Sequence, residues 1–188
     1  MSDDLEFEIP WKTPKERYQF TRHYLTFSEV KGEPTEFNDS LGSVCLSFTH
    51  LENEVSAAII KMINVNAEIG KILLSEQPFK NKLNLFGSLF QYYKSTHRFN
   101  SLFPDEEETF NELLKACFQC EVFRNQILHS DYHFTHPEIY RKKITAKATK
   151  GLTENQEKVD SAYILEISDY IYETGSNVEE FFFTFEKK

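Results

Sequence analysis

The chain has 188 residues, of which 40% are hydrophobic and 15% aromatic, and its formal net charge is −9. This length suits a single domain with one hydrophobic core, and a content of only six glycines and six prolines favours an all-α fold. The negative charge argues against nucleic-acid binding through the whole surface but leaves room for a local basic site.

The chain carries no sign of export or of a membrane span. No apolar run approaches the roughly 20 residues that cross a bilayer. The N-terminus MSDDLEFEIPWK is acidic, whereas a signal peptide begins basic and then turns apolar. Three cysteines are too few for a disulfide framework. We therefore expect a cytoplasmic protein with no membrane partner.

Helical periodicity begins after a mixed N-terminal segment. Residues 1–37 hold three of the six prolines and are expected to form an arm, followed by a helical domain over residues 38–188. The run Asn38-Asp39-Ser40 offers N-cap chemistry, and apolar residues from Leu41 to Ile63 then recur at three- and four-residue steps. Gly70 is expected to interrupt any extension of this helix.

Two further helices are predicted in the middle of the chain. One opens at Ser75–Pro78, because proline is tolerated in a first turn, and is followed by a loop over residues 94–104. The next starts at Asp105, where an aspartate cap precedes three glutamates that favour the positive end of the helix dipole. Cys117 and Cys120 lie on its apolar stripe, so we expect them in the core rather than in a redox or metal site.

The remainder is predicted as a turn at 131–137, a basic segment at 141–150, a polar loop at 151–158 and a last helix at 159–185. In this helix Ser168 and Gly175 would allow close backbone approach. The three phenylalanines at 181–183 exceed one apolar stripe, so some of them are expected to face a second surface, such as another subunit. The basic segment has two readings, a solvated loop or a contact with the RNA backbone. The second reading uses four of its cations, which are Arg141, Lys142, Lys143 and Lys147.

The most informative motif is Arg124-Asn125-Gln126-Ile127-Leu128-His129. Arginine can hold phosphate oxygens through a planar fork of donors, histidine can transfer a proton near neutrality, and Asn125 could orient either group. Arg124 also falls on the inward stripe of its helix, where an unpaired charge is costly unless it opens into a cleft. These features predict a site that handles a phosphodiester.

Helical geometry complicates this site. A five-residue step separates Arg124 and His129 by about 140° on an ideal helix, whereas Asn125 and His129 differ by about 40°. One chain would therefore assemble the site only if the helix ends or kinks near His129, and otherwise two chains would have to combine. The alternative is structural, with Arg124 in an internal ion pair and His129 at the helix C-terminus.

The motif resembles that of the HEPN family (higher eukaryotes and prokaryotes nucleotide-binding domain), whose members are small helical bundles with an Arg-x(4–6)-His motif and a polar residue after the arginine. Here Asn125 follows Arg124, and Ser130 follows His129, as is common in the family. The segments Ser47 to Val55 and Ser75 to Leu89 also resemble the first two helices of bacterial members. The resemblance covers roughly residues 40–185 and implies an HEPN-like bundle of four to six helices.

The resemblance also implies a function. HEPN ribonucleases are metal-independent endoribonucleases that act as homodimers, with the two motifs facing each other in a composite site, and many serve as toxins or antiviral (abortive-infection) effectors. By this resemblance Arg124, Asn125 and His129 would be catalytic, single-stranded RNA would be the substrate, no cofactor would be needed, and an antitoxin or inhibitor protein would be a further partner. The alternative is a non-catalytic HEPN-like module that binds a nucleotide or a protein.

The residues just after the motif leave two questions open. Toxin members often carry a tyrosine two residues after the histidine as a target of AMP transfer, but Asp131 stands there and Tyr132 comes one residue later. Tyr132 is thus a candidate for modification, for base stacking or for core packing. His129, His133 and His136 form a second candidate, a zinc site. No glutamate lies within this cluster to act as a base, so we predict no metal.

Overall fold

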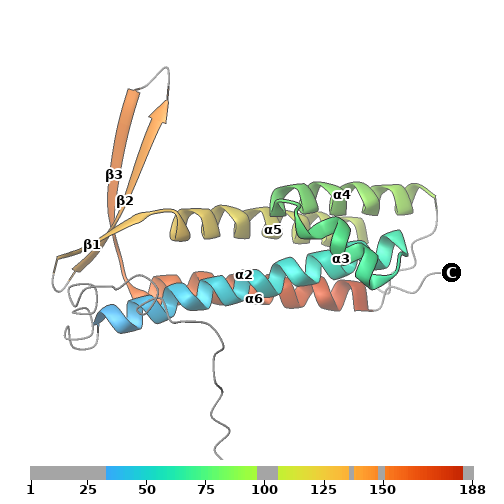
Figure 1. Ribbon diagram of the computed structural model, residues 1–188, viewed down its shortest axis with the longest axis horizontal. Coiled ribbons are helices and arrows are strands. Elements are labelled where there is room, and N and C mark those ends of the chain that lie inside the picture. Colours follow the sequence, from blue (N-terminus) through green and yellow to red (C-terminus); the bar gives the residue numbers. More distant parts are fainter. Residues whose placement is uncertain (1–32, 97–105, 136–137, 148–150, 184–188) are drawn as a thin grey trace, which may run out of the picture. The chain divides into compact units, whose positions relative to one another are not determined.

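The computed structural model describes residues 33–96, 106–135, 138–147 and 151–183, and of residues 33–34, 106, 143–147, 152–153 and 183 only the backbone is described. The chain divides at Phe37 into two units, and the contacts described below lie within the unit Phe37–Lys188. The described residues are mainly helical, as predicted, and form five helices. A three-stranded antiparallel sheet, which was not predicted, lies in the chain between the fourth and the fifth helix (Figure 1). None of these helices is long and apolar enough to span a membrane.

The first helix, α2 (Glu33–Ile63), begins before the predicted cap at residues 38–40. It ends because Asn64 adopts a left-handed conformation with a φ of 58°, which asparagine tolerates better than most residues. The side chain of Asn66 then caps α3 (Ala67–Ser75) by accepting a hydrogen bond from the backbone N–H of Glu68. Gly70 was expected to interrupt the helix, but it lies inside α3, and the break comes earlier at Asn64, so this prediction was wrong.

The next helices are α4 (Phe79–Ser95) and α5 (Glu106–Leu128), and the last is α6 (Ser161–Phe183). Helix α4 extends two residues into the predicted loop at 94–104, and residues 97–104 of that loop lie outside the described residues. Phe86 of α4 packs on Phe110 of α5, with ring centroids 5.1 Å apart. The buried pair Lys82–Glu52, at 2.7 Å, joins α4 to α2.

Helices α2 and α6 run side by side in the same direction (Figure 1). The hydroxyls of Ser47 and Ser168 are 2.9 Å apart, and further along both helices His50 stacks on Tyr172. A Cβ atom on Gly175 would lie 2.8 Å from Cδ2 of His50, so the predicted close approach at Gly175 is confirmed. Helix α5 runs antiparallel to α6, since Phe123 packs on Tyr170 while Leu113 lies near Phe181.

The sheet replaces the predicted turn and loops. Strands β1 (Asp131–Thr135), β2 (Glu138–Lys147) and β3 (Gly151–Val159) pair in the order β1-β2-β3. One face carries the buried Ile139 and Val159, while the described side chains of the other face, among them His133, Tyr140 and Lys158, are polar. The segment predicted as a turn at 131–137 is therefore mainly strand, and the polar loop at 151–158 is an edge strand. Both predictions were wrong.

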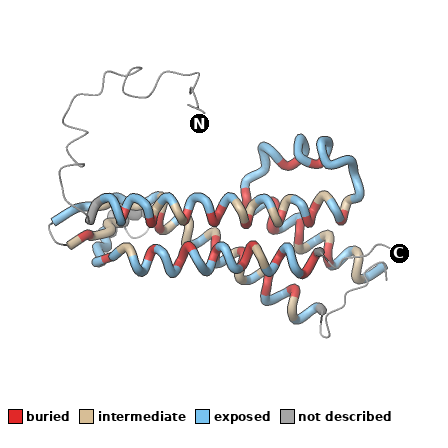
Figure 2. The backbone as a smooth tube through the Cα atoms, turned by 90° about the horizontal axis from the view of Figure 1, so that it is seen from below, coloured by how far each residue is buried: buried red, intermediate tan, exposed pale blue. Residues whose placement is uncertain are grey.

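The core lies along the facing stripes of the four long helices (Figure 2). Its centre is a cluster of aromatic rings in which Phe90 and Phe110 stack with centroids 3.6 Å apart. Phe181 and Phe182 also belong to this cluster, so these two phenylalanines face the core rather than a second surface. Cys117 and Cys120 are buried free thiols, which confirms their predicted place in the core.

Candidate functional site

The C-terminal turn of α5 is closed by side chains from the residues that follow it. The backbone N–H of His129 donates to the carbonyl of Asn125 at 3.3 Å, which completes the last helical turn. Ser130 Oγ then donates to the carbonyl of Gln126 at 2.6 Å, and the Tyr132 hydroxyl donates to that of Ile127 at 2.7 Å. These bonds satisfy carbonyls that a helix end would otherwise leave unpaired. The backbone around the motif is thereby fixed.

Arg124 brings the predicted site residues together. Its Nη1 atom donates to Oδ1 of Asn125 at 2.9 Å and lies 3.1 Å from Nε2 of His129. Its guanidinium carbon lies 5.3 Å from the centre of the Phe48 ring, a cation–π contact that supports the flat side chain from α2. Arginine, asparagine and histidine of one chain therefore form a single cluster.

The end of α5 explains how one chain brings Arg124 and His129 together. Arg124 and His129 lie about 140° apart on an ideal helix, but α5 ends at Leu128 and His129 sits in the following turn. The long arginine side chain covers the remaining distance. A second chain is therefore not needed to bring Arg124 into contact with His129.

The contact with Arg124 involves the ring nitrogen that a proton transfer would use. Arginine has five N–H donors and no acceptor, so a hydrogen bond between these side chains requires Nε2 of His129 to accept. An imidazole with a lone pair on Nε2 is the form that can remove a proton.

Arg124 lacks an acidic partner in the described part of the chain. The ion pairs there involve other cations, among them Lys82, Lys94 and Arg141. The Arg124 side chain is half-buried, and its Nε atom is buried without a hydrogen-bond partner. The structural alternative, an internal ion pair, thus finds no support among the described residues. A half-buried cation with unused donors is suited to an incoming anion.

Phe48 is the site residue that the sequence did not reveal. It lies on the apolar stripe of α2, and its ring also packs edge-on against Phe79 in the first turn of α4, at 4.8 Å. The Phe48 ring thus lies between the Arg124 guanidinium and Phe79 at the N-terminal, positive end of the α4 dipole. Nothing in the sequence distinguishes Phe48 from the other stripe phenylalanines.

Tyr132 is held in place by packing. Its ring lies edge-on to Phe37 at 5.0 Å, and burial raises the pKa of its hydroxyl to about 12. Because the hydroxyl donates to the carbonyl of Ile127, the geometry favours core packing over base stacking or modification.

The basic segment is strand β2 rather than a loop, and strand β3 opposes it with acids. Arg141 pairs with Glu157 and also donates to the carbonyl of Gln126 at 3.4 Å, while Lys142 lies 2.6 Å from Glu154. The side chains of Lys143 and Lys147 lie outside the described part of the structure. Arg141 therefore buttresses the end of α5, and contact with RNA through β2 would have to compete with these ion pairs.

The histidine cluster is only partly described, because His136 lies outside the described residues. Within those residues no three histidine, cysteine or acidic side chains converge as metal ligands. The thiols of Cys117 and Cys120 are buried in the core, where burial raises the pKa of Cys120 to about 11 and that of Cys117 still further.

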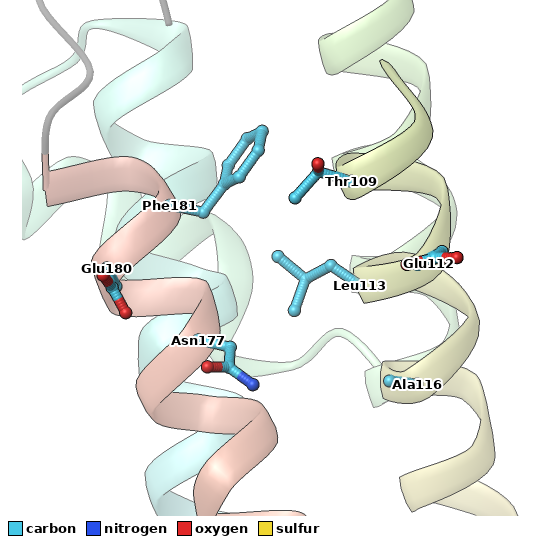
Figure 3. A pocket seen from close by; sticks show the side chains of 7 residues that line it. All are labelled: Thr109, Glu112, Leu113, Ala116, Asn177, Glu180 and Phe181. Atoms are coloured by element: carbon cyan, nitrogen blue, oxygen red, sulfur yellow. The ribbon is translucent and has the colours of Figure 1, made fainter. Parts of the chain in front are cut away.

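A pocket of about 320 Å³ opens between α5 and α6, two to three turns of α5 before Arg124. Leu113 and Phe181 point toward its centre (Figure 3). Glu112 and Glu180 also line it, and their carboxylates would repel a phosphate. This pocket is therefore not the anion site.

Comparison with protein-family models, with curated proteins and with solved structures gives no match for this chain.

Proposed function

We propose that Arg124, Asn125 and His129 bind a phosphodiester of single-stranded RNA and promote its cleavage without a metal ion. The observation that carries the proposal is the contact of one guanidinium with both Asn125 and His129, in a half-buried place where no described acid neutralises it. The HEPN-like motif supplies the substrate class. RNA carries its own nucleophile, the 2′-hydroxyl, so the protein has to supply positioning, charge and proton transfer.

Each residue has a separate role in the proposed reaction. Arg124 would move its Nη1 donor from His129 to an incoming phosphate oxygen, which frees the Nε2 lone pair. His129 Nε2 would then take the proton of the 2′-hydroxyl as its oxygen attacks phosphorus. The bond from phosphorus to the 5′-oxygen breaks, and this oxygen takes a proton from solvent. The products are a 2′,3′-cyclic phosphate and a 5′-hydroxyl end.

Asn125 would hold the guanidinium in place while Nη1 of Arg124 moves from His129 to the phosphate oxygen. Its Oδ1 accepts from the same Nη1 atom that contacts His129, and its backbone carbonyl accepts from the N–H of His129. Asn125 is therefore bonded to the Arg124 side chain and to the backbone of His129. The HEPN-like bundle and the role as a toxin or antiviral effector are parts of this proposal that come from the resemblance.

The proposal is tested by incubating end-labelled RNA in EDTA with the wild type and with Arg124→Ala, His129→Ala and His133→Ala variants. Loss of one charged donor or of a general base should slow cleavage by about 10²–10³-fold in the first two variants. His133→Ala is the matched control, because His133 is an exposed histidine four residues further on. RNA with 2′-O-methyl groups should bind but remain intact.

Three results would overturn the proposal. Equal cleavage by the wild type and both site variants would mean a contaminating nuclease. If the wild type were inactive in EDTA, and His133→Ala were inactive without EDTA, a metal site in the histidine cluster would be favoured. RNA or nucleotide binding that needs Arg124, without any cleavage by the wild type, would favour the alternative of a non-catalytic binding module.

A further inference from the structure

The ion pair between Lys82 and Glu52 lies in the seam between α4 and α2. Nζ of Lys82 is 2.7 Å from Oε1 of Glu52, and the exposed fractions of the two side chains are 7% and 34%. Apolar residues of similar size in place of a buried ion pair often stabilise a fold equally well or better. Stability alone therefore does not explain why a lysine is buried here, and the surroundings of the pair point to another role.

This ion pair lies one helical turn from the aromatic support of Arg124. Glu52 follows Phe48 by four residues on α2, so the two side chains share one face of that helix. Lys82 follows Phe79 by three residues and shares a face of α4 in the same way. The rings of Phe48 and Phe79 pack edge-on at 4.8 Å, and the guanidinium carbon of Arg124 lies 5.3 Å from the Phe48 ring. Next to this pair of rings, the seam thus carries a pair of charges.

The direction of helical side chains brings Glu52 toward Arg124. Side chains of an α-helix tilt toward its N-terminus, so that a residue covers the turn that precedes it. The turn that precedes Glu52 is that of Phe48, on which the guanidinium of Arg124 rests. Among the described residues, however, the ion pair of Glu52 is with Lys82 and not with Arg124. Glu52 is therefore an acid that could neutralise Arg124 if its carboxylate were released.

We propose that Lys82 holds the Glu52 carboxylate in the seam between α2 and α4 and thereby keeps Arg124 available for a phosphate. This inference rests on the proposed role of Arg124 in RNA binding, and it makes Lys82 a positioning residue for that role. A carboxylate and a phosphate oxygen use the same donors of a guanidinium, so Arg124 can serve the substrate fully only while Glu52 is held elsewhere.

Loss of the Lys82 charge should let Glu52 compete with RNA. Lys82→Met keeps an apolar stem in the seam but leaves Glu52 without its partner, and an unpaired carboxylate in this place is stabilised by turning to Arg124. A charged hydrogen bond must then break before a phosphate can bind, so the dissociation constant for RNA should rise about tenfold.

A second substitution should reverse this effect. The double variant Lys82→Met/Glu52→Gln removes the competing carboxylate and has the same formal net charge as the wild type. Its dissociation constant should therefore return to within about twofold of the wild-type value. A purely structural role of the ion pair would not predict such a recovery of affinity.

Fluorescence anisotropy with a labelled, 2′-O-methylated single-stranded RNA measures this affinity without cleavage. Lys94→Met is the matched control, because Lys94 also lies on α4 and pairs with Glu107. It is twelve residues beyond Lys82, which corresponds to about 18 Å of helix. Lys94→Met lowers the net charge by the same amount as Lys82→Met but should change the affinity much less.

Far-UV circular dichroism at the assay temperature should show that the variants are folded, because an unpaired buried charge can destabilise a fold. If Lys82→Met does not fold, Lys82→Gln takes its place. Its neutral amide keeps a polar group in the seam but holds the carboxylate less strongly than an ammonium does. Its affinity for the RNA should then lie below that of Lys94→Met, and Glu52→Gln should again restore it.

The outcomes separate this inference from the proposed function. A Lys82→Met variant that binds as well as Lys94→Met would overturn the inference, because Glu52 would then turn to solvent. A double variant that binds as weakly as Lys82→Met would also overturn it, since Lys82 would then act through its own charge. Wild-type affinity unchanged in Arg124→Ala would overturn the site and the inference together. RNA that binds through Arg124, and more weakly in Lys82→Met, but is never cleaved would support the inference and overturn the proposed catalysis.

Discussion

The two halves of α5 use the same inward stripe in opposite ways. In the N-terminal half, Phe110 is fully buried and stacks on Phe90 within a cluster of aromatic rings. In the C-terminal half, the stripe position between Cys120 and Ile127 is occupied by Arg124, which keeps a buried nitrogen without a partner. The first half contributes to stability, whereas the second half carries a cation that none of the described acids neutralises.

The free energies involved make this difference instructive. Burying a phenylalanine side chain contributes about 1.5–3 kcal/mol, whereas a half-buried charge without a counter-ion costs free energy. Arg124 recovers part of this cost from Phe48, Asn125 and His129. In our proposal a bound phosphate offsets the remainder.

The largest effect on stability is expected in the aromatic half. Phe110→Ala should lower the free energy of unfolding by about 3–5 kcal/mol, because the cavity lies among rings that cannot collapse freely. Urea denaturation followed by circular dichroism measures this change. Leu46→Ala, at an exposed position, should stay within about 0.5 kcal/mol of the wild type. A loss below about 1 kcal/mol for Phe110→Ala would mean that this cluster is not the centre of the core.

The removal of the Arg124 charge is expected to change the free energy of unfolding very little. Arg124→Met keeps the length and apolar stem of the side chain but removes the charge, so the free energy of unfolding should remain within about 1 kcal/mol of the wild type. RNA cleavage should nevertheless be lost. A destabilisation above about 2 kcal/mol would show that Arg124 serves the fold.

A further effect on stability concerns Tyr132, at the boundary between α5 and the sheet. Tyr132→Phe removes the hydrogen bond to the Ile127 carbonyl and should cost about 0.5–1.5 kcal/mol at neutral pH. Because burial raises the pKa of Tyr132 from 10.0 to about 12, the unfolded state loses this proton first as the pH rises. Stability should therefore fall between these two pH values, and less steeply in Tyr132→Phe. Equal slopes in urea titrations of the two proteins would contradict this account.

The helices could be predicted from the sequence because burial repeats with their period. The sheet could not, because β3 buries little beyond Val159, and its polar residues act by pairing with β2, as Glu157 does with Arg141. Such pairing depends on register, which the sequence of one strand does not contain. The break at Asn64 depends on a left-handed backbone that many asparagines do not adopt.

For the site, the residue types and the inward position of Arg124 could be predicted from the sequence, but the contact between Arg124 and His129 could not. That contact depends on where α5 ends and on the reach of the arginine side chain. The support from Phe48 depends on how α2 packs against α5, which is a property of the tertiary structure.

The central claim, that one chain assembles the whole site, is tested most directly by mixing Arg124→Ala and His129→Ala proteins and measuring RNA cleavage in EDTA. If Arg124 and His129 of the same chain act together, the mixture should cleave no faster than either variant alone, at concentrations where dimers form. If each site took its arginine from one chain and its histidine from the other, mixed dimers would regain one intact site. Recovery of a substantial share of wild-type cleavage would contradict the claim.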